Sequence, residues 1–355
     1  MSRRQRRADR ARRGRNLALA AIGGLVLFAG AVVVAAIVII VVTGGSDDDG
    51  AVRTPARDAA STTTSPPTST TVPVTAPEVP APPTTLAGPP YAVETARTTV
   101  VDATRGTEAR GPTPASSSRT LPLTVHVPSG PGPFPLVVFA HGYDISAADY
   151  ADFQRDLAAQ GFVVVAPDFP RSSTAFPGPP TQDDIDEQAR DVGVVVDQML
   201  DGAVSGIWSG KIRAGEAGVV GHSDGGNTVA RVAGNSCCMA PRVGAAAVLS
   251  GDEGTSGGQW GVAGSPPMLF VQGTADSINP WSFTQRLYDD AASPKTLVAI
   301  DGAGHLEPYT TGPQRGAVVD LVAAFLRAHL TGDAAAGSQI STLAEVGDLR
   351  FVSSS

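Results

Sequence analysis

The chain has 355 residues, a formal net charge of -8 and only two cysteines. An acidic protein is a poor partner for nucleic acid. Two adjacent cysteines also exclude a disulfide-built small scaffold and a zinc cluster of the usual Cys spacing. The 40 Gly and 29 Pro are unevenly spread along the chain, which therefore divides into segments of different character.

The N-terminal segment predicts a membrane anchor. Residues 1–16 carry eight Arg and one Asp, and residues 17–42 contain no charged or strongly polar side chain. As a helix, 26 residues reach about 39 Å, enough to cross a hydrocarbon core of about 30 Å. The apolar run is longer than that of a cleavable signal peptide, so we expect a retained signal anchor, with cleavage as the alternative. By the positive-inside rule residues 1–16 stay cytoplasmic, which predicts a single-pass protein of the cell membrane with an extracytoplasmic catalytic domain.

Residues 43–90 have the composition of a stalk. Between residues 46 and 90 there are ten Pro and ten Thr but no Phe, Trp or Tyr. Because such a stretch has little apolar surface to bury, it cannot offset the entropy cost of ordering. We expect a disordered Pro/Thr-rich linker, with a glycosylated or wall-binding segment as the alternative.

Residues 91–332 alternate short apolar runs with amphipathic stretches, which predicts one α/β domain. The runs are almost continuously apolar, as in parallel strands covered by helices on both faces. Such strands are expected at 136–140, 162–166, 217–220, 245–249, 268–272 and 296–300. Helices are expected at 147–160, 181–200, 225–233, 280–291 and 313–330, and antiparallel strands at 91–104 and 119–127. The predicted fold is a mostly parallel, doubly wound sheet with antiparallel N-terminal strands, followed by a C-terminal tail at 333–355.

The candidate nucleophile follows the expected strand 217–220. Ligand sites in such sheets lie beyond the carboxyl ends of the strands. There the chain reads Gly-His-Ser-Asp-Gly at 221–225, a G-x-S-x-G pattern in which the serine occupies a strained strand-to-helix turn. A second match, at 254–258, lies in a Gly-rich loop with neither a strand before it nor a helix after it. We therefore predict Ser223 as the nucleophile.

A serine hydroxyl needs a histidine base, and the base needs a carboxylate that holds its tautomer. Of the five histidines, His305 follows the last expected parallel strand in a Gly-rich loop. Asp276 follows the strand at 268–272, so Ser223, Asp276 and His305 each follow a different strand of the same sheet. Other acids that follow strands remain alternatives for the carboxylate: Asp168, Asp252 and Glu253.

Acyl transfer also needs N–H donors for the developing oxyanion. We expect them from the backbone of Asp224, which follows the nucleophile, and of Tyr143, in the turn after the strand at 136–140. The predicted substrate-lining side chains are the aromatic ring of Tyr143 and three aromatics of the long loops, Phe176, Trp260 and Trp281.

Over residues 91–332 these features resemble the α/β-hydrolase superfamily, whose triads have the chain order Ser, Asp, His. The segments 139–143, 161–168, 221–223 and 302–305 are similar to the dienelactone-hydrolase-like branch, which includes bacterial cutinases and platelet-activating-factor acetylhydrolase-like esterases. The resemblance implies a serine nucleophile, a small-molecule ester substrate and no metal or organic cofactor. Two features depart from the cutinases: Asp224 replaces their usual Met, and the adjacent Cys237 and Cys238 cannot reproduce their C-terminal disulfide. Polyester hydrolysis is therefore not expected.

The predicted function is a membrane-anchored extracytoplasmic serine hydrolase that cleaves carboxylic esters through an acyl-enzyme intermediate. Two alternatives remain: a surface acyltransferase with the same triad, and a non-catalytic binding module with the same fold. Cys237 and Cys238 are interpreted as two buried small apolar side chains or as a disulfide between neighbours.

Overall fold

The computed structural model describes residues 90–252 and 257–355. The expected basic N-terminus, membrane helix and stalk therefore lie, except for Pro90, outside the described residues. Within the described residues, no helix combines the length and the apolar character needed to span a bilayer.

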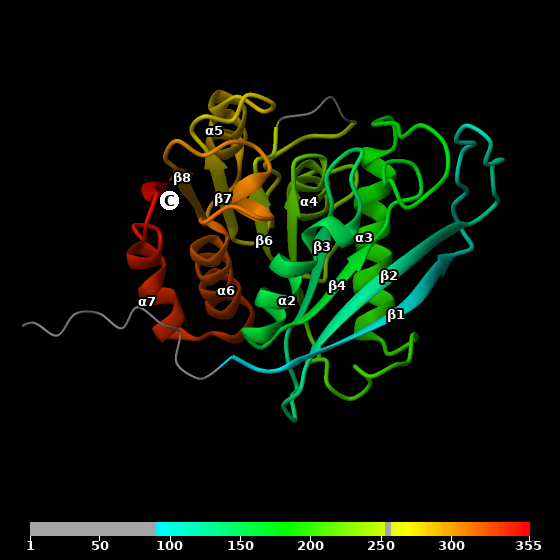
Figure 1. The fold of residues 1–355 in the computed structure, drawn as a ribbon, viewed down its shortest axis with the longest axis horizontal. Helices are drawn as coiled ribbons and strands as arrows, with labels where there is room; N and C mark the ends of the chain where they lie inside the picture. Colours follow the sequence, from blue (N-terminus) through cyan, green and yellow to red (C-terminus); the bar gives the residue numbers. More distant parts are fainter. Residues whose placement is uncertain (1–89, 253–256) are drawn as a thin grey trace, which may run out of the picture. The chain divides into compact units, whose positions relative to one another are not determined.

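A nine-stranded sheet forms the middle of the domain, in the order β1-β2-β4-β3-β5-β6-β7-β8-β9 (Figure 1). The six strands from β4 to β8 in this order are parallel: β4 (Val163–Pro167), β3 (Leu136–Ala140), β5 (Ala217–His222), β6 (Val243–Leu249), β7 (Met268–Gly273) and β8 (Lys295–Ile300). Antiparallel strands flank them: β1 (Val93–Asp102) and β2 (Arg119–Pro128) at one side and β9 (Leu349–Ser354) at the other. The expected mostly parallel sheet is confirmed.

Helices cover both faces of the sheet. One face carries α3 (Ile185–Leu200), α4 (Asp224–Gly234) and α5 (Trp281–Asp290), and the other carries α2 (Ala151–Ala159), α6 (Arg315–Thr331) and α7 (Ala334–Leu343). Two short 3-10 helices, η1 (Ala147–Tyr150) and η2 (Glu307–Tyr309), lie in the loops. Along β3 the side chains alternate between the two cores: Val138 packs with the first set of helices, whereas Val137 and Phe139 pack with the second. Burial on both faces explains why the strands read as continuous apolar runs.

The domain extends beyond the boundary expected at residue 332. The expected tail at 333–355 contains α7, which packs on α6, and β9, which pairs with β8. Main-chain hydrogen bonds join Lys295 to Ser355 and Asp301 to Asp348, and the Leu349 side chain is buried. The sequence of β9 concealed this role because only one of its two faces is packed, so it lacks the continuous apolar run of the central strands.

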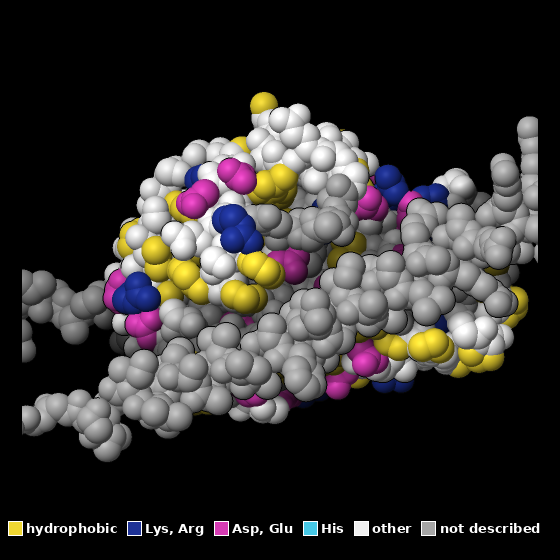
Figure 2. Space-filling model, turned by 90° about the horizontal axis from the view of Figure 1, so that it is seen from above, with side chains coloured by type: hydrophobic (Ala, Val, Ile, Leu, Met, Phe, Trp, Pro, Cys, Tyr) yellow, Lys and Arg dark blue, Asp and Glu magenta, His cyan; other side chains and the backbone are white. Residues whose placement is uncertain are grey.

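The surface of the described residues is mixed in character on the face drawn in Figure 2. Acidic, basic and apolar side chains are interspersed there, without an extended patch of one sign.

Candidate active site

Ser223 occupies a sharp turn between β5 and α4. Its backbone has φ 58° and ψ -123°, a conformation that non-glycine residues rarely adopt. The flanking glycines are required sterically: a Cβ on Gly221 would lie 2.1 Å from the carbonyl oxygen of Gly225, and a Cβ on Gly225 would lie 2.0 Å from that of Ala140. The G-x-S-x-G pattern therefore reflects close backbone packing that lifts the serine out of the strand.

The structure brings the three predicted triad residues together. His305 Nε2 lies 2.9 Å from Ser223 Oγ, and His305 Nδ1 lies 2.7 Å from Asp276 Oδ2. The Asp276 carboxylate accepts hydrogen bonds, so Nδ1 carries the proton and Nε2 is free to accept the serine proton. The side chain of His305 is 15% exposed and Ser223 is partly exposed, so a substrate can reach both.

Asp276 is held as an ionised acceptor. Burial opposes its ionisation, but the hydrogen bonds from the His305 ring and from the backbone N–H groups of Asn279 and Ile278 outweigh that effect, so its pKa lies below the usual value. Each backbone N–H donates to Oδ1 at 2.9 Å, whereas Oδ2 accepts from His305 at 2.7 Å and from the Gln272 side chain at 3.5 Å. Asn279 is fixed in turn because its side-chain amide donates to the carbonyl oxygen of Ser250 at 2.7 Å.

Two backbone N–H groups near Ser223 have the expected character of oxyanion donors. Asp224 is the first residue of α4, where the N–H has no intrahelical acceptor. Tyr143 follows Gly142, whose α-carbon is so close to the nucleophile that a Cβ there would lie 3.3 Å from Ser223 Cβ. Among the described residues, neither the Asp224 nor the Tyr143 N–H donates to another protein atom. Both groups therefore lack a protein acceptor, and their role as oxyanion donors stays a prediction.

The side chain of Asp224 is buried beside the nucleophile. Burial raises its pKa, an effect opposed by the Gln182 side chain, whose Nε2 lies 3.1 and 3.0 Å from the two carboxylate oxygens, and reinforced by the nearby Asp252. Gln182 lies in the loop before α3. This contact turns the Asp224 carboxyl towards that loop.

The four aromatic residues predicted to line the substrate site do not form one cluster in the described structure. Tyr143 is exposed and its hydroxyl donates to the carbonyl oxygen of Pro180 at 3.2 Å. Phe176 lines a separate cavity of about 130 Å³, and the Trp260 indole donates to the carbonyl oxygen of Leu287. Trp281 is partly buried against the core. In the described part of the chain no ring contact or hydrogen bond joins Phe176, Trp260 or Trp281 to the triad, and their role in substrate binding stays a prediction.

The alternative carboxylates have other partners. Asp168 accepts hydrogen bonds from the Ala147 backbone and the Ser173 hydroxyl, and Asp252 accepts one from Asn227. Glu253 lies outside the described residues.

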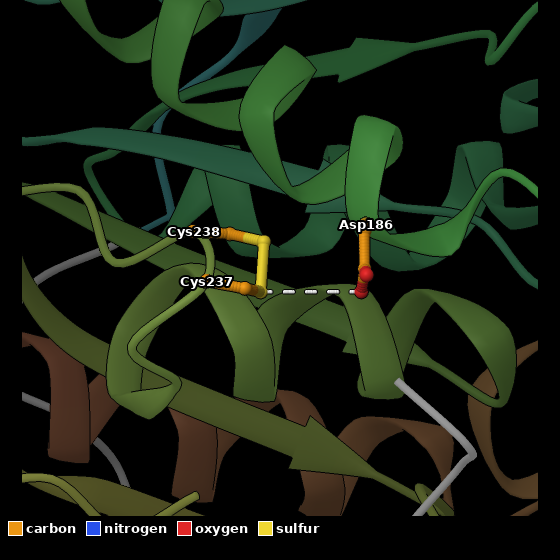
Figure 3. Close-up of side chains that lie close together, drawn as sticks. All are labelled: Asp186, Cys237 and Cys238. Atoms are coloured by element: carbon orange, nitrogen blue, oxygen red, sulfur yellow. Dashed lines mark hydrogen bonds between the residues drawn. A yellow bond between two sulfur atoms is a disulfide. The ribbon is translucent and has the colours of Figure 1, made fainter. Parts of the chain in front are cut away.

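Cys237 and Cys238 form a disulfide, which was the second of the two interpretations from sequence. Cys237 Sγ lies 3.9 Å from Asp186 Oδ1 (Figure 3). Within the described ranges these three residues are the one set whose ligand atoms lie close enough to hold a metal ion. The disulfide occupies both sulfur atoms, and the residues lie at the far end of α4 from Ser223.

The structure places three residues behind the triad to which the sequence analysis gave no role: His222, Tyr150 and Tyr309. The His222 ring is buried, and its Nε2 lies 2.8 Å from the carbonyl oxygen of His305. Tyr150 contacts the other ring nitrogen of His222, and the ring of Tyr309 packs against it with centroids 4.7 Å apart. The one available signal was the position of His222, directly before the nucleophile at the end of a buried strand.

Comparison with known proteins supports the relationship suggested by these residues. Chlorophyllase-1, chloroplastic, of Citrus sinensis is 28% identical over 116 residues, which cover 32% of this chain and 33% of that protein. The uncharacterized protein YfhR of Escherichia coli (strain K12) is 35% identical over 60 residues, which cover 17% of this chain and 21% of that protein. The chain thus covers a third or less of the length of these relatives.

The family model described as chlorophyllase matches residues 95–272. This segment runs from β1 to β7 and contains Ser223, whereas Asp276 and His305 follow it. It spans half of the chain and confirms the resemblance to α/β-hydrolases. The chain belongs to the chlorophyllase family, a family of α/β-hydrolase-type esterases.

Proposed function

We propose that the protein is a serine hydrolase that cleaves carboxylic esters and acts outside the cytoplasm from a membrane anchor. The observation that carries the proposed reaction is the hydrogen-bonded series from Ser223 through His305 to Asp276. Membership of an esterase family supports it. The proposed anchoring rests on the basic and apolar segments at 1–16 and 17–42.

The reaction proceeds in two acyl-transfer steps. Ser223 Oγ attacks the ester carbonyl while His305 Nε2 takes the hydroxyl proton, and the imidazolium then protonates the departing alcohol. Water attacks the acyl-enzyme in the same way, and Ser223 recovers its proton from His305. Asp276 keeps the imidazole in the productive tautomer and stabilises its cation.

The negative charge that develops on the carbonyl oxygen is stabilised by the N–H groups of Tyr143 and Asp224. Such donors act strongly because they are oriented before the reaction begins. Loss of one donor in an oxyanion site costs on the order of 10²–10³ in kcat. The position of Asp224 at the N-terminus of α4 adds the favourable end of a helix dipole.

Hydrolysis of a panel of esters by the full-length protein in detergent tests this proposal. The panel contains short-chain p-nitrophenyl esters and chlorophyll, which is included because the matching family model is described as chlorophyllase. We expect hydrolysis of at least one ester, a loss of about four to six orders of magnitude in kcat for Ser223→Ala, and a loss of about 10⁴ for Asp276→Asn. Ser256→Ala, in the second G-x-S-x-G match, is the control and keeps full activity.

The same assay separates the alternatives. Preferential transfer of the acyl group to an added alcohol would identify an acyltransferase. Binding of esters without turnover, unchanged in Ser223→Ala, would identify a non-catalytic module and contradict the proposed function.

A further inference from the structure

The loop that carries the candidate base is anchored on both sides of His305, by hydrogen bonds of the Ala303 backbone and of the Leu306 carbonyl oxygen. The backbone of Ala303 is hydrogen-bonded on both sides, to Ile300 and to Ala275. Beyond it, the His305 carbonyl oxygen accepts a hydrogen bond from His222 Nε2 at 2.8 Å. Among the described residues no backbone N–H donates to this carbonyl. The main chain of His305 is thus held by the residue that precedes the nucleophile.

The direction of each hydrogen bond at His222 follows from its partners. A carbonyl oxygen only accepts, so His222 Nε2 carries the proton. Nδ1 of the neutral ring is then an acceptor, and it receives the Tyr150 hydroxyl proton at 2.7 Å. A rigid ring with a donor and an acceptor on opposite sides therefore joins Tyr150 to the base loop.

Tyr150 connects this arrangement to the loop of the candidate oxyanion donors. Its hydroxyl lies against the backbone of Gly142, the residue before Tyr143. A Cβ on Gly142 would lie 3.1 Å from that hydroxyl and 3.3 Å from Ser223 Cβ. The same buried pair, Tyr150 and His222, thus contacts both sides of the nucleophile.

We propose that His222, oriented by Tyr150, is a positioning residue for the reaction: its Nε2–H holds the His305 main chain so that the imidazole stays within reach of both Ser223 and Asp276. This inference rests on the proposed function. His222 touches neither substrate nor reacting atoms in this role.

The electrostatic setting favours a neutral His222. Burial, and secondarily the neighbouring His305, lower the pKa of His222 to about 3. The two imidazole rings have centroids 4.6 Å apart. The first step of the reaction makes His305 cationic. A positive charge on His222 at that separation would oppose this step, whereas a neutral His222 ring does not.

His222→Phe tests the inference because it keeps a ring of similar size and removes both hydrogen bonds. A misplacement of about 1 Å at a reacting group costs about a hundredfold. We expect kcat for a p-nitrophenyl ester to fall about ten- to a hundredfold in His222→Phe, with KM changed less than about twofold. We expect kcat to fall by a smaller factor in Tyr150→Phe. His222→Gln keeps an N–H donor, so its kcat should lie between those of His222→Phe and the wild type.

The matched control is His126→Phe. His126 is also buried between two polar partners, Thr95 and Gln154, but it lies on β2. We expect the His126→Phe substitution to lower the melting temperature, while kcat of the folded enzyme stays at the wild-type value. Equal kcat in His222→Phe and wild type would overturn the inference and leave His222 as a packing residue.

A readout without substrate keeps the inference separate from the proposed function. The low-field proton NMR signal of His305 Nδ1–H reports its bond to Asp276. We expect this signal in the wild type and its loss or displacement in His222→Phe, with no change in His126→Phe. An unaltered signal in His222→Phe contradicts the positioning role whether or not the wild type hydrolyses esters, whereas absent wild-type turnover alone contradicts the proposed function.

Discussion

Burial keeps three histidines neutral in the folded domain: the pKa values of His126, His141 and His222 are lowered, in each case first by desolvation. The pKa of an unfolded histidine is about 6.5. Between pH 6.5 and the lower folded pKa the unfolded state therefore binds more protons, and stability is lost as the pH falls through this window. The free energy of unfolding is therefore free of this loss only above pH 6.5.

This linkage predicts an acid-sensitive domain. For each such histidine the free energy of unfolding falls by up to about 1.4 kcal/mol per pH unit below pH 6.5. Urea unfolding at pH 7 and pH 5 measures the fall. We expect His222→Phe to be less stable than wild type at pH 7 but to lose less stability between the two pH values. An equal loss in both proteins would show that His222 is not neutral in the fold.

At single residues, the sequence predicted the groups that chemistry constrains. The G-x-S-x-G pattern indicated Ser223. Asp276 and His305 were predicted because a serine nucleophile needs a base and a carboxylate, and both residues follow expected strands. His222 and Tyr150 carry no comparable pattern, because their roles depend on which backbone atoms the fold brings beside them. The loop sequence around Phe176 likewise does not determine which cavity its ring enters, and its role in substrate binding stays a prediction.

The secondary-structure elements were predictable where two faces are buried. Continuous apolar runs locate β3 to β8, and the connecting segments locate the helices between them. The last helix and strand were not predicted. α7 is rich in small residues, and apolar and polar residues alternate only weakly along β9. Their place in the fold depends on a free edge of β8, which the local sequence does not reveal.

The packing of β9 predicts that the C-terminal segment stabilises the domain. Leu349 is 3% exposed and belongs to the core shared by α6 and α7, whereas Val352 on the same strand is 38% exposed. Leu349→Ala should lower the free energy of unfolding by about 2–5 kcal/mol through the cavity it leaves. Val352→Ala should change it by about 0.5 kcal/mol or less. Chemical denaturation compares the two, and similar small effects would indicate that β9 contributes little.

For the whole molecule, the proposed membrane anchor depends on residues 17–42. Full-length protein expressed in a bacterial cell should sediment with membranes and resist extraction by carbonate. Deletion of 17–42 should release it into the soluble fraction. Full-length protein found in the soluble fraction, with its N-terminus intact, would contradict the anchor and leave the proposed hydrolase activity unaffected.

The central claim is that Ser223 becomes a nucleophile when the chain is folded, and covalent labelling tests it most directly. Full-length protein in detergent is treated with a fluorophosphonate probe, and the modified residue is located by peptide mass spectrometry. The account predicts one adduct, on Ser223, that is absent in Ser223→Ala and forms far more slowly in His305→Ala. A folded wild-type protein that takes up no probe, or one labelled equally after Ser223→Ala, would contradict it.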